Sequence, residues 1–259
     1  MSWELNQGDC LEGLRTLADK SIDATITDPP YEAEAHTLQR RQKGKVTVVG
    51  REEYRAVSDA PLTFAPITSD QRADVAVQIG RVTRSVALVF CQVEAVQQWR
   101  VALEAGGLKY RRTIPWIKPD AMPSLHGRWP GQAFEAIVLA TRPGAKPCPI
   151  GGKALSYSFS RAQGASQSQR KGSSNSAPHP TTKPLALMRA MVADFTRPGE
   201  LVLDPFAGSG STGVACGMLG RRFIGWELDA SYYEIARRRL SGEEAKPRPE
   251  QPSLFGGAF

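Results

Sequence analysis

Residues 200–213 read ELVLDPFAGSGSTG, and this stretch decides the fold. An apolar run of strand length ends at Asp204, a glycine-rich turn follows, and a helix-forming run comes next. Gly208, Gly210 and Gly213 have the spacing G-x-G-x-x-G. A glycine loop between a strand and a helix lets the backbone approach a nucleotide-like ligand at the helix N-terminus. The stretch therefore predicts an α/β fold with a ligand site at this turn.

The acids around the loop indicate which ligand it takes. Glu227 follows Gly208 by 19 residues, at the end of the next expected strand, so a nicotinamide-dependent oxidoreductase is one interpretation. However, Asp204, Pro205, Phe206 and Ala207 separate the strand from the first glycine, and a strand-end acid would face a pyrophosphate unfavourably. A carboxylate there suits a sulfonium or ammonium group, and a second one can accept both ribose hydroxyls. S-adenosylmethionine fits this chemistry.

Strands and helices alternate along the rest of the chain, which favours a largely parallel sheet covered on both faces. We expect one Rossmann-like domain over residues 1–240, with a mixed sheet of about seven strands. Residues 32–66 form an insertion that we expect to be mobile, and residues 241–259 a flexible tail. Strands are expected at 3–9, 21–28, 85–91, 108–118, 134–142, 200–204 and 222–228, and helices at 11–19, 68–84, 92–107, 184–195, 211–219 and 231–240.

The basic charge is concentrated in one segment. The net charge is +7, yet residues 136–193 contain no acid. A long acid-free basic span indicates contact with a polyanion, whereas an ordinary charge run is only a solvated face. The cysteines and histidines are scattered, which argues against a metal site. No signal pattern or membrane-length apolar run is present, so a cytoplasmic protein without a membrane partner is expected.

A second motif ends the expected strand 21–28. The sequence TITDPPYEA (residues 25–33) passes from an apolar run to Asp28, Pro29, Pro30 and Tyr31. By itself this is as consistent with a turn as with a site, because prolines end strands. Read with the glycine loop, it predicts a catalytic group at the carboxyl end of a neighbouring strand.

Together, DPPY and the later DPFAGSGSTG resemble the β class of amino DNA methyltransferases, which methylate adenine N6 or cytosine N4. The stretches NQGDCLEGL, HPTTKPLALM, TIPWIKP, FEAIVLATRPG and GWELDASYYEIARRRL are similar to further segments of that family, in the family's order. The resemblance covers most of the chain outside residues 32–66, 142–178 and the tail. It departs from the family's simplest form in the long 32–66 insertion and the short 142–178 segment.

The resemblance implies roles for named residues. The catalytic residues would be Asp28, Pro29, Pro30 and Tyr31, with the Asp28 carboxylate and Pro29 carbonyl accepting the amine hydrogens and Tyr31 stacking on the base. The residues implied to hold S-adenosylmethionine are Asp9, Cys10, Asp28, His179, Lys183, Pro184, Asp204, Pro205, Phe206, Ala207, Gly208, Ser209, Gly210, Thr212, Glu227 and Leu228.

The implied partner is double-stranded DNA, from which the target base must be flipped out. The 32–66 insertion would face DNA, and residues 142–178 would form a short target-recognition segment. Expected phosphate contacts are Arg40, Lys43, Lys45, Arg161, Arg170 and Lys171. A homodimer is compatible with the resemblance. The tail is similar to peptides that bind the bacterial sliding clamp, through Gln251, Leu254 and Phe255.

Four alternatives stay open at this point. The family uses Asp more often with adenine and Ser more often with cytosine, so adenine is favoured and a cytosine amine is the alternative. Protein glutamine methyltransferases carry a similar motif, usually with Asn at the position of Asp28 and the cofactor motif first. The remaining two are the oxidoreductase and a nucleic-acid-binding module without catalysis.

Overall fold

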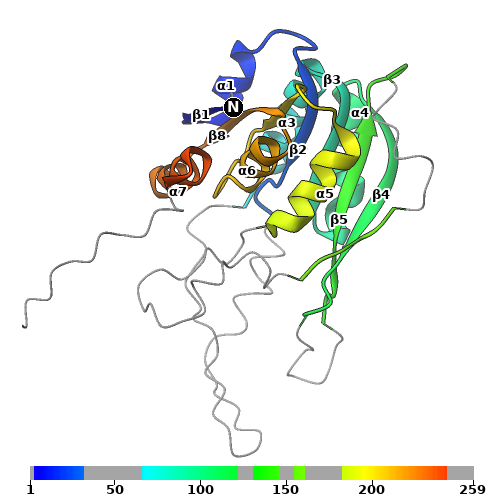
Figure 1. Cartoon of the computed structure of the whole chain (residues 1–259). Coiled ribbons are helices and arrows are strands. Elements are labelled where there is room, and N and C mark those ends of the chain that lie inside the picture. The colour runs from blue at the N-terminus through cyan, green and yellow to red at the C-terminus, as the bar shows by residue number, and fades with distance from the viewer. Residues whose placement is uncertain (1–2, 32–65, 122–130, 146–154, 161–182, 244–259) are drawn as a thin grey trace, which may run out of the picture.

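The computed structural model describes residues 3–31, 66–121, 131–145, 155–160 and 183–243, and Figure 1 shows the whole chain. Its strands are β1 (Trp3–Gln7), β2 (Ile22–Thr27), β3 (Thr83–Cys91), β4 (Lys109–Ile117), β5 (Phe134–Thr141), β6 (Tyr157–Ser158), β7 (Leu201–Asp204) and β8 (Arg222–Glu227). Its helices are α1 (Cys10–Thr16), α3 (Ser69–Val82), α4 (Val96–Ala105), α5 (Leu185–Phe195), α6 (Ser211–Met218) and α7 (Ala230–Ser241), with a 3₁₀ turn at Val93–Ala95.

The strands form one mixed sheet in the order β1-β8-β7-β2-β3-β5-β4-β6. Neighbouring strands are parallel except where β5 runs antiparallel to β3 and β4. The expected mixed α/β sheet is confirmed, with eight strands in place of about seven. The additional strand is β6, which lies within the 142–178 segment and pairs in parallel with β4.

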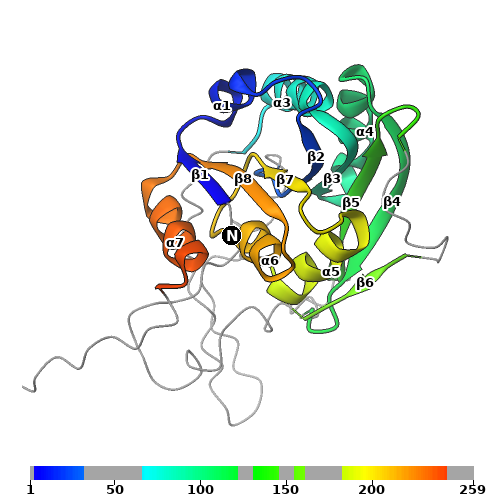
Figure 2. The same cartoon turned by 45° about the horizontal axis from the view of Figure 1, so that its top comes forward.

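Two helical layers enclose the sheet, as Figure 2 shows. Helices α1, α3 and α4 cover one face, and α5, α6 and α7 cover the other. The central strands are apolar on both faces because both faces are buried: every residue of β2 has little exposed surface. One core joins α5 and α6 to the sheet through Met188, Met191 and Ala215, and a second places Trp99 of α4 against the opposite face.

The first and last strands of the domain lie side by side. β1 pairs in parallel with β8, with Trp3 opposite Phe223 and Gln7 opposite Glu227. The N-terminal strand and the C-terminal part of the domain therefore pack together. β2 also lies next to β7, with Ala24 opposite Val202. This adjacency brings the ends of the two motif-bearing strands together at one edge of the sheet.

Helix α3 packs very closely against the end of α4. A Cβ on Gly80 would lie 1.9 Å from the Gly106 carbonyl oxygen, and a Cβ on Gly106 would lie 2.4 Å from the Ala76 carbonyl oxygen. Both obstacles are backbone atoms, which a rotamer change cannot remove. Only glycine fits at this crossing.

We expect Gly80→Ala to lower the free energy of unfolding by about 1–3 kcal/mol, because the two helices must separate. Urea denaturation followed by circular dichroism measures this. Val77→Ala on the same helix is the matched control, because Val77 is 45% exposed, and it should change stability by less than about 0.5 kcal/mol. Equal stability of Gly80→Ala and the wild type would contradict the close approach.

Two further observations concern the end of the domain and the length of its helices. Helix α7 continues to Ser241, one residue past the expected end of the domain at 240. None of the helices in the described ranges is long and apolar enough to cross a membrane.

Candidate active site

The ends of β2 and β7 are joined by a buried hydrogen bond. The Thr27 hydroxyl donates to Asp204 Oδ1 at 2.7 Å, across 177 positions of sequence. Because both strands are parallel and adjacent, the Asp-Pro-Pro-Tyr segment and the glycine loop leave the sheet at the same edge. This confirms the expected placement of the two motifs at the carboxyl ends of neighbouring strands.

Asp204 is an internal support of the glycine loop. Its side chain is buried, Oδ1 also accepts from the Phe206 backbone N–H, and Oδ2 accepts from the Thr212 hydroxyl at 2.5 Å. Burial raises the pKa of Asp204 to about 6, and its hydrogen bonds offset only part of that rise. The carboxylate therefore ties both ends of the loop to β2.

The loop itself has the backbone that its glycines predict. Gly208 and Gly210 have φ angles of 53° and 78°, in the left-handed region. Gly213 packs so closely that a Cβ would lie 2.7 Å from the Leu240 side chain. The turn thus presents backbone without side chains at the edge of the sheet.

Arg239 of α7 stabilises the glycine loop through hydrogen bonds that the sequence interpretation missed. Its guanidinium donates to the Ser209 carbonyl oxygen, and to the Ser209 Oγ at 2.9 Å. The chain offers one signal for it: the basic run at residues 237–239 lies on the helix that follows the Glu227 strand.

Three further expected cofactor residues meet at the ends of β1 and β8. Glu227 accepts from the backbone N–H of Gly208 at 2.8 Å and of Asp229 at 2.9 Å, one bond to each carboxylate oxygen. Burial raises the pKa of Glu227 despite these bonds. Leu228 is 71% exposed. Asp9 caps helix α1 by accepting from two backbone N–H groups through Oδ1.

Cys10 lies at the same edge, directly after Asp9. Its thiol is partly buried against the core beneath α3 and α4. Burial, together with the negative charge of Asp9, raises the pKa of Cys10 to about 12, so the thiol stays protonated near neutral pH. The arrangement gives Cys10 a packing role rather than a nucleophilic one.

Asp28 lies just beyond β2, on the sheet face that α5 covers. Its Oδ2 accepts from Lys183 Nζ at 2.5 Å. Its Oδ1 is buried, and no group in the described part of the chain donates to it. Burial raises the pKa of Asp28, an effect that the positive charge of Lys183 opposes. The site therefore holds one carboxylate oxygen occupied and one open to an external donor.

Lys183 stands immediately before α5 and is only 10% exposed. Its ammonium lies 5.1 Å from the centre of the Phe90 ring and 5.4 Å from that of Tyr31, distances typical of cation–π contact. Burial alone would lower the pKa of Lys183, but the carboxylates of Asp28 and Glu135 outweigh it and raise the pKa. Pro184, its neighbour, occupies the N-cap position of α5 without a side-chain capping bond.

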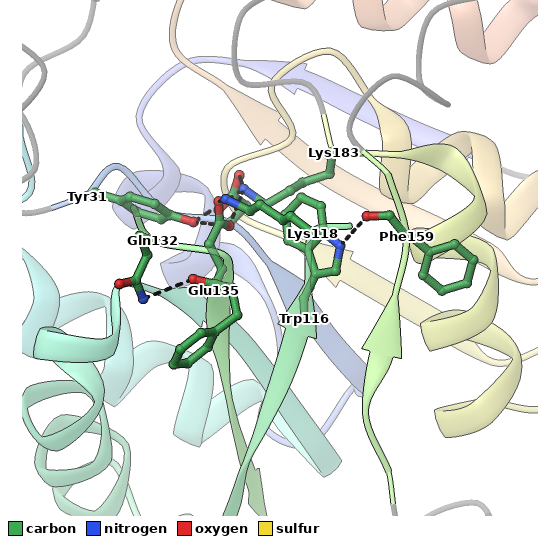
Figure 3. A network of polar contacts seen from close by, with 9 residues as sticks. Tyr31, Trp116, Lys118, Gln132, Glu135, Phe159 and Lys183 are labelled. Atoms are coloured by element: carbon green, nitrogen blue, oxygen red, sulfur yellow. Dashed lines mark hydrogen bonds and ion pairs between the residues drawn. The ribbon is translucent and has the colours of Figure 1, made fainter. Parts of the chain in front are cut away.

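A second charged pair, Glu135 and Lys118, joins Asp28 and Lys183 in one charged cluster, and the sequence interpretation missed both. Figure 3 shows their side chains converging with those of Tyr31 and Lys183. The Tyr31 hydroxyl donates to Glu135 Oε2 at 2.6 Å, and Lys118 Nζ donates to Oε1. Burial would raise the pKa of Glu135, yet the two lysines lower it to about 2. Burial and the neighbouring carboxylates hold the pKa of Tyr31 well above its usual range.

Trp116 connects this charged cluster to the segment around β6. Its ring packs edge-on against Phe90, and Lys118 Nζ lies 5.0 Å from its ring centre. Its indole N–H donates to the Phe159 carbonyl oxygen at 3.0 Å, as Figure 3 shows. Tyr157 of β6 in turn donates to Asp194 of α5. The part of the 142–178 segment around β6 is thus anchored beside the charged cluster.

Several expected site residues lie outside the described ranges. These are His179, Gln251, Leu254, Phe255, Arg40, Lys43, Lys45, Arg161, Arg170 and Lys171. Their roles stay predictions. Pro29, which is buried, and Pro30 lie within the described part, between Asp28 and Tyr31.

A glycine loop with a strand-end acid at one side and an open carboxylate oxygen beside an aromatic ring defines the class of methyltransferases that use S-adenosylmethionine. A family model described as DNA methylase, for N6 and N4 amines, matches residues 22–238. The chain therefore belongs to the N6/N4 DNA methylase family. It is a DNA methyltransferase that depends on S-adenosylmethionine and acts on double-stranded DNA.

Individual relatives agree with this assignment. The type II methyltransferase M.HinfI of Haemophilus influenzae is 24% identical over 262 residues, covering 96% of this chain and 70% of the relative. M.Cfr9I of Citrobacter freundii, also a type II methyltransferase, is 27% identical over 275 residues, covering 93% and 88%.

Solved structures share the fold. The M1.HpyAVI complex with S-adenosylmethionine is 26% identical, with a TM-score of 0.64, and covers 92% of this chain and 98% of that one. The cytosine-N4-specific PvuII DNA methyltransferase has a TM-score of 0.68 at 16% identity, over 93% and 86% of the two chains. The family assignment decides against the oxidoreductase interpretation.

Proposed function

We propose that the chain methylates the exocyclic amine of an adenine flipped out of duplex DNA. The observation that carries this proposal is the open Oδ1 of Asp28, a buried acceptor whose partner oxygen is held by Lys183. A buried carboxylate oxygen without a donor is costly, so it suits a ligand that brings one. An amine hydrogen is such a donor, and the Tyr31 ring beside it offers a face for the base.

The residues present fit the cofactor. Gly208 and Gly210 leave backbone accessible, and Glu227 keeps acceptor capacity on both carboxylate oxygens beyond its two backbone bonds. Leu228, exposed beside Glu227, supplies an apolar surface for an adenine ring. The full proposed set is Asp9, Cys10, Asp28, His179, Lys183, Pro184, Asp204, Pro205, Phe206, Ala207, Gly208, Ser209, Gly210, Thr212, Glu227 and Leu228.

S-adenosylmethionine supplies an electrophilic methyl group, which bonds to the amine nitrogen as the sulfur keeps the electron pair of the broken S–C bond. The chain's own residues prepare the amine. Asp28 Oδ1 and the Pro29 carbonyl each accept one amine hydrogen, which favours a pyramidal nitrogen and stabilises its developing positive charge. Asp28 can then hold the proton that the nitrogen loses. Pro29 and Pro30 keep the carbonyl rigid and supply no competing N–H.

Adenine is proposed over cytosine because the family that the sequence resembles uses Asp at the first position of this motif more often with adenine. The same acceptors would serve a cytosine amine, and one enzyme of this fold is cytosine-N4-specific. The test is methyl transfer to duplex DNA, followed by mass analysis of the released nucleosides. We expect N6-methyladenine. N4-methylcytosine would overturn the choice of base, and the absence of any methylated nucleoside would overturn the proposal as a whole.

The cofactor half of the site is tested separately by Glu227→Gln. Loss of a charged acceptor to the ribose should weaken S-adenosylmethionine binding about 10- to 100-fold, as expected for a charge-assisted hydrogen bond of roughly 1.5–3 kcal/mol. Calorimetric titration measures the affinity, and the melting temperature of the free protein monitors the fold. Glu234→Gln on α7 is the control, because its exposed carboxylate pairs only with Arg237 and Arg238 in the described contacts. Unchanged affinity in Glu227→Gln would contradict the assignment.

A further inference from the structure

Glu135 occupies a central place in the charged cluster beside the Asp-Pro-Pro-Tyr segment. It lies at the start of β5, opposite Trp116 of β4. One carboxylate oxygen accepts from the Tyr31 hydroxyl and lies 3.4 Å from Lys183 Nζ, and the other accepts from Lys118. It therefore affects the Asp-Pro-Pro-Tyr segment at two places. It contacts Tyr31 directly, and it contacts Lys183, which in turn binds Asp28.

Charges of opposite sign alternate through this charged cluster. Asp28, Lys183, Glu135 and Lys118 follow one another as acid, base, acid, base, each in contact with the next. The last three are only 10%, 16% and 11% exposed. Charges so shielded from water interact strongly, so removal of one changes the state of the others.

We propose that Glu135 is a positioning residue for the target base. It fixes the Tyr31 ring through its hydroxyl and holds Lys183 where the ammonium covers one oxygen of Asp28. The other oxygen is then left for the amine. This inference rests on the proposed function, because it assigns Glu135 a part in presenting that acceptor and that ring.

Glu135 does not itself offer an acceptor to the base. Tyr31 and Lys183 occupy Oε2, and Lys118 occupies Oε1. A carboxylate fully engaged with two cations stays ionised through the working pH range and is not a proton acceptor. Its effect on the reaction must pass through the groups it holds.

The arrangement predicts opposite effects of the two missed residues on Asp28. The groups that act on the Asp28 carboxyl are Lys183 before α5, Glu135 on β5 and Lys118 after β4, with Tyr31 and the Asp204 carboxyl of β7 also in the electrostatic surroundings. Burial raises the pKa of Asp28 and Glu135 raises it further, whereas Lys183 and Lys118 lower it. Below that pKa the protonated acid loses an acceptor, so activity falls.

The experiment compares Glu135→Gln with Lys118→Met through the pH dependence of kcat at saturating DNA and cofactor. The acid limb should move to lower pH in Glu135→Gln and to higher pH in Lys118→Met. The double variant, in which the charge balance is restored, should return the limb towards its wild-type position. A structural ion pair with no connection to Asp28 would leave the limb in place, and this result, or equal shifts in both variants, would overturn the inference.

A second readout does not need turnover. Fluorescence of 2-aminopurine at the target position, in DNA without cofactor, reports how the flipped base stacks on Tyr31. We expect Glu135→Leu and Tyr31→Phe to change it alike, with no further change when combined, because both remove the hydrogen bond between the Tyr31 hydroxyl and the Glu135 carboxylate. Additive changes would overturn the inference.

Two controls separate the possible failures. Glu234→Gln should behave as wild type in both measurements. If Glu135→Gln does not fold, Lys118→Met and Tyr31→Phe still carry the limb shift and the stacking change. Wild-type protein that transfers no methyl group to DNA would refute the proposed function itself, a result distinct from an active wild type whose variants show no shift.

Discussion

Asp28→Ala should lower kcat on duplex DNA on the order of 10³-fold, while S-adenosylmethionine affinity changes by no more than about threefold. The variant removes the acceptor that stabilises positive charge on the amine nitrogen, and that charge develops only in the transition state. Asp28 also belongs to the proposed cofactor set, but the other residues of that set should keep most of the affinity for the cofactor. Single-turnover methyl transfer and calorimetric titration measure the two quantities.

Asp28→Asn separates hydrogen-bond acceptance from charge. An amide oxygen can still accept an amine hydrogen at the open position, but the amide nitrogen would face the Lys183 ammonium, and two donors then compete. We expect kcat between those of Asp28→Ala and the wild type. Substantial residual activity in Asp28→Ala would refute the catalytic assignment, because no other carboxylate of the charged cluster has a buried oxygen without a donor.

The parts of the site that the sequence predicts follow from strand geometry. A glycine turn after one parallel strand and Asp28 after another must lie at the same edge of the sheet, since parallel strands share their carboxyl ends. Glu227 follows from the same rule. These predictions need only strand order, which the two motifs and their resemblance supply.

Glu135 and Lys118 could not be predicted in this way. They stand at adjoining ends of antiparallel strands, and whether they meet depends on the register of β4 against β5. A shift of one residue would turn Glu135 to the opposite face. The orientation of Lys183 towards Asp28 likewise depends on where α5 begins on the sheet. The detectable signal was a lysine just after one expected strand and a glutamate at the start of the next.

The supporting role of Asp204 was also hidden. The sequence predicts Asp204 at the strand end, as a carboxylate that faces the cationic cofactor. In the structure its oxygens accept from Thr27, Thr212 and the Phe206 N–H. Two threonines 185 positions apart in sequence cannot be paired from their spacing; only the adjacency of β2 and β7 joins them to one acid.

Asp204→Asn should therefore leave the fold intact and weaken the cofactor site. The amide oxygen can accept from Thr27 and Phe206, and the amide nitrogen can donate to the Thr212 hydroxyl, which rotates to accept. The lost negative charge should reduce affinity for the cationic cofactor on the order of 10-fold. Calorimetric titration of Asp204→Asn against wild type tests this.

The stability of the same variant should respond to pH in a defined direction. The folded-state pKa of Asp204 is raised to about 6, from an unfolded value near 3.8. The folded wild type therefore holds a proton that the unfolded chain releases, and its stability is lost as pH rises from about 4 through 6. That loss amounts to at most about 3 kcal/mol, and Asp204→Asn, which cannot ionise, should not show it. Urea denaturation at pH 4 and pH 7 measures the difference. If the stability of the wild type instead rises over this interval while that of Asp204→Asn stays level, the folded protein stabilises the ionised form of Asp204. The hydrogen bonds from the threonine hydroxyls would then outweigh burial in setting the pKa of Asp204.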